Sequence, residues 1–153
     1  MTQRFAGNEE LTAFLLTMSG LEPCRILELS TGEKTAREQL LAQGFFAEAM
    51  AEADTVLHTG FPDGTFDAIL SEGSMFLSED PAAARKEAAR LLRQGGLLLL
   101  ADGSRLSSKA HVLELEAAGF QVLHVEDATE LWGGADVEGE EPLRYLLTIC
   151  EKK

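Results

Sequence analysis

Cysteine is scarce in this chain, and its scarcity excludes one class of protein. The 153 residues include two cysteines, Cys24 and Cys150, and each lies within an apolar run that is typical of a strand. Small secreted domains that depend on disulfides carry many more cysteines than this. We therefore expect two buried free thiols in a reducing compartment, and the sequence predicts neither a disulfide nor a metal site.

Basic residues are also few. Thirteen lysines and arginines stand against 26 aspartates and glutamates, which gives a formal net charge of −13, and the acids are spread along the chain. A surface of this charge repels the phosphate backbone of DNA and RNA. Nucleic acid is therefore not expected as a partner.

Long hydrophobic runs and low-complexity tracts are missing as well. No segment approaches the length of a membrane span, and residues 1–16 contain no apolar stretch of the signal-peptide type. We therefore expect a cytoplasmic protein without a membrane partner. A chain of 153 residues that is 45% hydrophobic and 25% charged is expected to form a single globular domain over residues 1–153.

What the sequence does contain is an alternation of strand and helix patterns. Helices are predicted over 8–20, 34–44, 80–93 and 107–119, and strands over 24–29, 55–60, 66–72, 97–102, 120–127 and 143–150. Residues 45–54 fit either a helix or a stunted strand. Such alternation indicates an α/β fold with a mainly parallel sheet that binds its ligand at the carboxyl ends of the strands.

Residues 61–103 carry a specific pattern. A Pro-Asp-Gly turn at 62–64 precedes the strand Phe-Asp-Ala-Ile-Leu, a helix ends in Arg-Gln-Gly-Gly at 93–96, and a leucine-rich strand ends at Asp102. This segment strongly resembles the central part of class I S-adenosylmethionine-dependent methyltransferases, and residues 20–32, 115–127 and 143–153 resemble its flanking parts. The resemblance implies a Rossmann-like methyltransferase fold. Its sheet would be seven-stranded and mostly parallel with an antiparallel last strand, and the region of the second strand is shortened.

The resemblance also implies where S-adenosylmethionine would bind. Glu28 matches the acid at the end of the first strand that organises the methionine moiety of the cofactor. The turn after it, with Ser30, Thr31, Gly32 and Lys34, matches a turn that usually has three alternating glycines, of which only Gly32 remains. The motif is therefore degenerate, and an ion pair between Glu28 and Lys34 across an empty turn is the alternative to a cofactor contact.

Three further acids and hydroxyls are candidates for cofactor binding. Glu48 has about the spacing of the acid that holds the ribose hydroxyls in the family, although no convincing strand precedes it. Ser71 and Glu72 match the strand end where cofactor and substrate meet in the family. His58, His111 and His124 are scattered along the chain and are not expected to act as ligands or bases.

Two functions follow from this pattern, and the sequence leaves both open. The first is methyl transfer from S-adenosylmethionine to an unidentified small molecule. This reaction needs little acid or base chemistry, because positioning supplies most of the rate, and so no catalytic residue is assigned. The alternative is an inactive methyltransferase-like domain that has lost its cofactor and serves as a binding or dimerisation module.

A homodimer is also expected. The shortened second-strand region should leave one edge or face of the sheet less covered, with Phe45, Phe46 and Met50 as exposed apolar surface.

Overall fold

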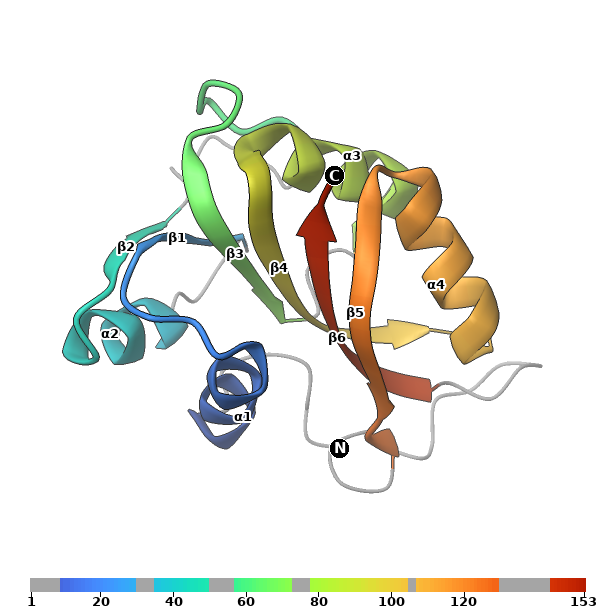
Figure 1. Ribbon diagram of the computed structural model, residues 1–153, viewed down its shortest axis with the longest axis horizontal. Coiled ribbons are helices and arrows are strands. Elements are labelled where there is room, and N and C mark those ends of the chain that lie inside the picture. The colour runs from blue at the N-terminus through green and yellow to red at the C-terminus, as the bar shows by residue number, and fades with distance from the viewer. Residues whose placement is uncertain (1–8, 30–34, 50–56, 73–77, 105–106, 130–143) are drawn as a thin grey trace.

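The computed structural model describes residues 9–29, 35–49, 57–72, 78–104, 107–129 and 144–153 of the chain (Figure 1). Its elements are α1 (Glu9–Ser19), β1 (Arg25–Glu28), α2 (Thr35–Ala42), β2 (Phe46–Ala49), β3 (Phe66–Glu72), α3 (Pro81–Leu91), β4 (Leu92–Ser104), α4 (Ser108–Ala117), β5 (Phe120–Asp127) and β6 (Arg144–Lys152).

The strands form one sheet in the order β2-β1-β3-β4-β6-β5. Strands β2, β1, β3 and β4 are paired in parallel, whereas β6 is antiparallel to both β4 and β5. The predicted α/β fold with an antiparallel last strand is therefore confirmed. In the described part of the chain the sheet has six strands, and not the seven that the resemblance implied.

Helices cover both faces of the sheet. Leu11 and Leu15 of α1 and Leu40 of α2 pack with Leu70 and Leu99 on one face. The buried residues of α3 and α4 pack on the other face in a second cluster, which includes Ala84, Ala88, Leu98, Leu100, Leu115 and Phe120. Figure 1 shows α1 and α2 together at the lower left of the sheet, and α3 and α4 at its upper right. The run of leucines in β4 fits this arrangement, because a strand covered on both faces needs apolar residues at successive positions.

The region from 45 to 49 corrects two expectations. Residues Phe46–Ala49 form a short strand at the edge of the sheet, and Glu48 lies inside it, so the interpretation that no strand accompanies Glu48 is wrong. Phe45 was expected to be exposed, but it is buried in the cluster beneath α2, because α2 supplies an apolar face at this edge. Phe46 points outward with 74% of its surface exposed, as expected, and Met50 lies outside the described residues.

Residues 57–60 are not the strand that the sequence predicted, and residues 55 and 56 lie outside the description. In this segment His58 forms only an isolated bridge. Side chains of α3 hold the segment instead: the Thr59 amide donates to the Glu87 carboxylate at 2.9 Å, and Arg90 binds both Glu87 and Asp63. Burial raises the pKa of Glu87, but hydrogen bonds from Arg90 and Thr59 outweigh it and lower the pKa to about 2. Glu87 is therefore charged at neutral pH and fixes this connection.

The parallel strands bring their carboxyl ends to one edge of the sheet. Glu28, the last residue of β1, is in register with Leu70 of β3, and Glu72, the last residue of β3, is in register with Ala101 of β4. The side chains of Glu28 and Glu72, which are far apart in the sequence, therefore lie at the same edge of the sheet.

Candidate functional site

Two buried carboxylates lie at the carboxyl ends of neighbouring parallel strands. Glu28 ends β1 and Glu72 ends β3, and each is only 6% exposed. Because side chains alternate along a strand, Glu28, Leu70 and Glu72 all face the side of the sheet that α1 and α2 cover. Two of the predicted site residues are therefore brought together.

Each carboxylate accepts a hydrogen bond from one of the two covering helices. The backbone amide of Arg37, in the first turn of α2, donates to Glu28 Oε1 at 3.1 Å. The first amides of a helix have no partner within the helix, and their partial positive charge favours an ionised carboxylate. The hydroxyl of Thr12 on α1 donates to Glu72 Oε2 at 2.6 Å.

The surroundings of Glu72 change its acidity. Burial raises its pKa, the hydrogen bond from Thr12 lowers it, and the negative charge of Glu28 raises it, with the result that the pKa is about 7. Glu72 is therefore poised to gain or lose a proton near neutrality. A positive charge placed beside the pair would favour the ionised form of both acids.

Ser71 lies at the same strand end. Its side chain is fully buried, and its Oγ has no hydrogen-bond partner among the described residues. A buried hydroxyl without a partner is costly in free energy, so such an atom at a strand end indicates a group that the description does not contain.

Two further buried polar residues, Tyr145 and Asp102, belong to the two strands that follow β3 in the order of the sheet. Tyr145 of β6 and Asp102 of β4 are both buried, and Tyr145 is in register with Gly103 of β4. Burial, followed by the negative charges of Glu72 and Asp102, raises the pKa of Tyr145 far above its usual value. Tyr145 is therefore a neutral hydroxyl at any physiological pH.

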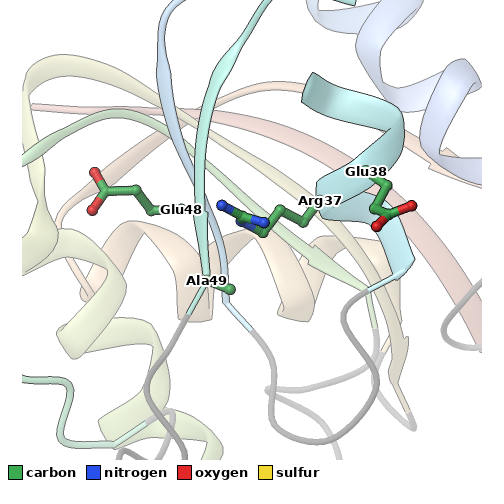
Figure 2. A pocket seen from close by; sticks show the side chains of 4 residues that line it. All are labelled: Arg37, Glu38, Glu48 and Ala49. Carbon is green, nitrogen blue, oxygen red and sulfur yellow. The ribbon is translucent and has the colours of Figure 1, made fainter. Parts of the chain in front are cut away.

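A hollow of about 440 Å³ lies between α2 and β2 and is lined by Arg37, Glu38, Glu48 and Ala49. Figure 2 shows Arg37 reaching from α2 toward β2, while Glu38 points away from the strands and Glu48 points away from α2. The Glu48 carboxylate binds Arg25 Nε at 2.6 Å. Arg37, which lines this hollow, also donates its backbone amide to Glu28.

The remaining predicted site residues are not described. Ser30, Thr31, Gly32 and Lys34 lie outside the described residues, and the expected pairing of Lys34 with Glu28 or Glu72 stays a prediction. Sequence reasoning missed Thr12. The signal that marks it is a polar residue directly beside Leu11 on the buried face of α1, where an apolar residue is usual.

Two features are absent from the described part of the chain. No group of three or more His, Cys, Asp or Glu side chains within it is arranged to hold a metal ion. No helix within it is long and apolar enough to cross a membrane.

Residues 7–100 match the profile of a protein family described as "Methyltransferase domain". This match covers more than half of the chain. The chain therefore belongs to this family, the class I S-adenosylmethionine-dependent methyltransferases that the central motif resembles. No curated protein matches the sequence at a significant level.

Solved structures of the same fold are similar to this one at low sequence identity. One is the 1,6-didemethyltoxoflavin-N1-methyltransferase of Burkholderia thailandensis, with 17% identity, a TM-score of 0.72, and coverage of 94% of this chain and 77% of that one. Another is a TehB-like S-adenosylmethionine-dependent methyltransferase of Corynebacterium glutamicum, with 19% identity, a TM-score of 0.69, and coverage of 97% and 90%. A third is the [4+2]-cyclase SpnF, with 16% identity, a TM-score of 0.64, and coverage of 94% and 80%. At these identities the likeness shows the fold alone.

Proposed function

We propose that this protein transfers a methyl group from S-adenosylmethionine to a small molecule. The observation that carries the proposal is the buried pair of Glu28 and Glu72 at the carboxyl ends of β1 and β3, in a chain that belongs to the methyltransferase family. In a parallel α/β sheet this edge is where ligands bind.

The residues at this edge fit the proposed cofactor. S-adenosylmethionine carries an ammonium and a sulfonium group. A pair of buried carboxylates is suited to two positive charges, because burial, and then the charge of Glu28, raise the pKa of Glu72 and a nearby cation offsets both effects. Ser71 follows Leu70 and therefore faces the opposite side of the sheet from the acid pair, where its unpartnered Oγ provides a hydrogen-bonding group at the same strand end. When bound, the cofactor supplies an electrophilic methyl group.

Each predicted residue then has a part in binding or orientation. Glu28, held by the amide of Arg37, accepts the ammonium group, while Ser71 and Glu72 line the place where cofactor and acceptor meet. The turn with Ser30, Thr31, Gly32 and Lys34 remains the predicted cradle for the methionine portion. Glu48 remains the predicted partner of the ribose, and it would have to exchange its bond with Arg25 for that contact.

A small acceptor is favoured over a macromolecular one. The net charge of −13 repels polyanions such as nucleic acids, and the similar enzyme from Burkholderia thailandensis was solved with the small molecule 1,6-didemethyltoxoflavin bound. Because one fold hosts many reactions, and SpnF of the same fold is a cyclase, the acceptor and even the reaction must be tested directly.

Titration calorimetry of the purified protein with S-adenosylmethionine and S-adenosylhomocysteine tests this function. We expect dissociation constants in the range of about 1–100 μM, which is typical for enzyme ligands. NAD is a suitable control, because it shares the adenosine but carries a negative pyrophosphate that Glu28 and Glu72 would repel. If neither sulfur compound binds at about 1 mM, the alternative holds: the chain is a methyltransferase-like module without a cofactor.

We also propose a homodimer that forms through the edge of the sheet at β2. The support is Phe46, whose side chain is 74% exposed on a four-residue strand that is at the edge of the sheet in the described part of the chain. Light scattering at micromolar concentration should give twice the mass of the chain, and Phe46→Ser should reduce it to the mass of a monomer. A wild-type monomer across this range contradicts the prediction. A cytoplasmic location remains an expectation from the sequence.

A further inference from the structure

We propose that the Glu28–Glu72 pair distinguishes the methyl donor from its demethylated product by exchanging one proton for the sulfonium charge. In this proposal, S-adenosylmethionine binds with release of a proton from Glu72, whereas S-adenosylhomocysteine binds without it. The inference rests on the proposed function and adds to it a mechanism by which product is released.

The geometry places two acids close together in a poorly solvated place. Both carboxylates are 6% exposed, both face the side of the sheet under α1 and α2, and they end adjacent strands. Their separate hydrogen bonds, from Thr12 to Glu72 and from the amide of Arg37 to Glu28, hold them in place. Two like charges in such surroundings do not both ionise readily, so the pair retains one proton up to about neutral pH.

The proton is retained on Glu72. The two acids differ in their donors, because Glu28 accepts from an amide at the beginning of α2, which favours its ionised form. Burial and then the charge of Glu28 act against ionisation of Glu72, the hydroxyl of Thr12 offsets them only in part, and its pKa is about 7.

No other described group near Glu72 takes up or releases a proton near neutral pH in its place. Thr12, which α1 contributes, does not titrate, and Tyr145, from β6, stays protonated because its pKa is raised. The negative charge of Asp102, from β4, acts on Tyr145 and helps to raise its pKa. Among the described residues, no basic side chain contributes to the pKa of Glu72. Lys34 lies outside them and is addressed by the experiment.

The charges of the two ligands match the two states of the pair. The donor carries an ammonium, a sulfonium and a carboxylate, while the product has lost the sulfonium charge. The two cationic groups of the donor are best matched by two ionised carboxylates. The single cationic group of the product is best matched by a pair in which Glu72 keeps its proton. Methylation of an N–H or O–H acceptor releases one proton, and Glu72 regains one when the sulfonium charge disappears, so the protons balance.

The test is calorimetric titration with each ligand at about pH 6 and about pH 8, in two buffers of different ionisation enthalpy. We expect S-adenosylmethionine to bind about five- to tenfold more tightly at the higher pH and to release a proton near pH 7. This size follows because a group with a pKa near 7 is mostly protonated at the lower pH and mostly ionised at the higher. S-adenosylhomocysteine, which is matched by the protonated pair, should release no proton and should not bind more tightly at the higher pH.

Variants assign the effect to Glu72. Glu72→Gln should remove the pH dependence and narrow the difference between the two ligands. Thr12→Val, which deletes the donor that lowers the pKa of Glu72, should move the midpoint of the pH dependence upward. Glu116→Gln removes an exposed acid of α4 on the other side of the sheet and should behave as the wild type. Thermal unfolding of each variant checks that it is folded.

Two results would overturn the inference, and they are distinct. If both ligands bind with the same pH dependence and without proton release, the proposed function stands but Glu72 does not exchange a proton. That outcome is expected if Lys34 already neutralises the pair. If neither ligand binds at any pH, the proposed function fails, and the inference fails with it.

Discussion

The variant Glu28→Gln is expected to bind S-adenosylmethionine about ten- to a hundredfold more weakly than the wild type. A hydrogen bond to a charged group contributes about 1.5–3 kcal/mol, and each 1.4 kcal/mol is a factor of ten in affinity. Glutamine has the shape of glutamate and can still accept from the amide of Arg37, so the change removes the charge and leaves the contact. Calorimetric titration with S-adenosylmethionine measures the effect.

The same variant is not expected to lose stability. Removing the charge of Glu28 removes one cause that raises the pKa of Glu72, and thus relieves a repulsion within the buried pair. Thermal unfolding should therefore occur at the same temperature as in the wild type or at a higher one. This combination is typical of a binding site, where function opposes stability. Glu116→Gln, which removes one charge from the exposed side of α4, is the matched control. Unchanged affinity, or a clearly lowered unfolding temperature, would show that Glu28 is a structural acid.

The second large effect concerns His111 and pH. This side chain of α4 is buried, and its Nε2 lies 3.0 Å from the hydroxyl of Thr148 on β6. Burial, and then the positive charge of Arg85, lower the pKa of His111 from 6.5 to about 4. Between about pH 4 and 6.5, His111 is therefore neutral in the folded protein and protonated in the unfolded protein.

The free energy of unfolding should therefore decrease as the pH falls through this window. Above pH 6.5 the histidine is neutral in both states and costs nothing; between 6.5 and about 4 only the unfolded state takes up the proton, which favours unfolding. At 1.36 kcal/mol for each unit, the loss amounts to roughly 3 kcal/mol once the pH reaches about 4.

Urea unfolding of the wild type and of His111→Gln at about pH 7 and about pH 4 measures this contribution. Glutamine cannot take up a proton in this range and can still bond to Thr148. The difference in free energy between the two proteins should change by roughly 3 kcal/mol between the two conditions, in favour of the variant at low pH. Comparing the two proteins cancels the titration of the carboxylates, including Glu72. A difference that does not change with pH would contradict the prediction.

The sequence by itself determined the order and type of most elements. Local signals carry this information: Asp80 caps α3 by accepting from the amide of Ala83, and Ser107 caps α4 by accepting from the amide of Ala110, and both residue types are favoured at the beginning of a helix. The run of leucines at 97–100 indicated the strand β4, which the two core clusters cover on both faces, and the family resemblance added the antiparallel direction of β6. The family resemblance also identified Glu28 and Glu72, because it matches both to strand ends where the family binds its cofactor.

Only the tertiary structure decided the remaining features. Residues 46–49 have no strong strand pattern, and they form β2 because β1 offers backbone partners beside them and α2 buries Phe45. Residues 57–60 have a strand-like pattern, yet the buried Glu87 of α3 binds Thr59 and no sheet strand forms. The hydrogen bond from Thr12 to Glu72 joins residues 60 positions apart. Such contacts depend on how distant segments pack, and local sequence preference is too weak to decide between them.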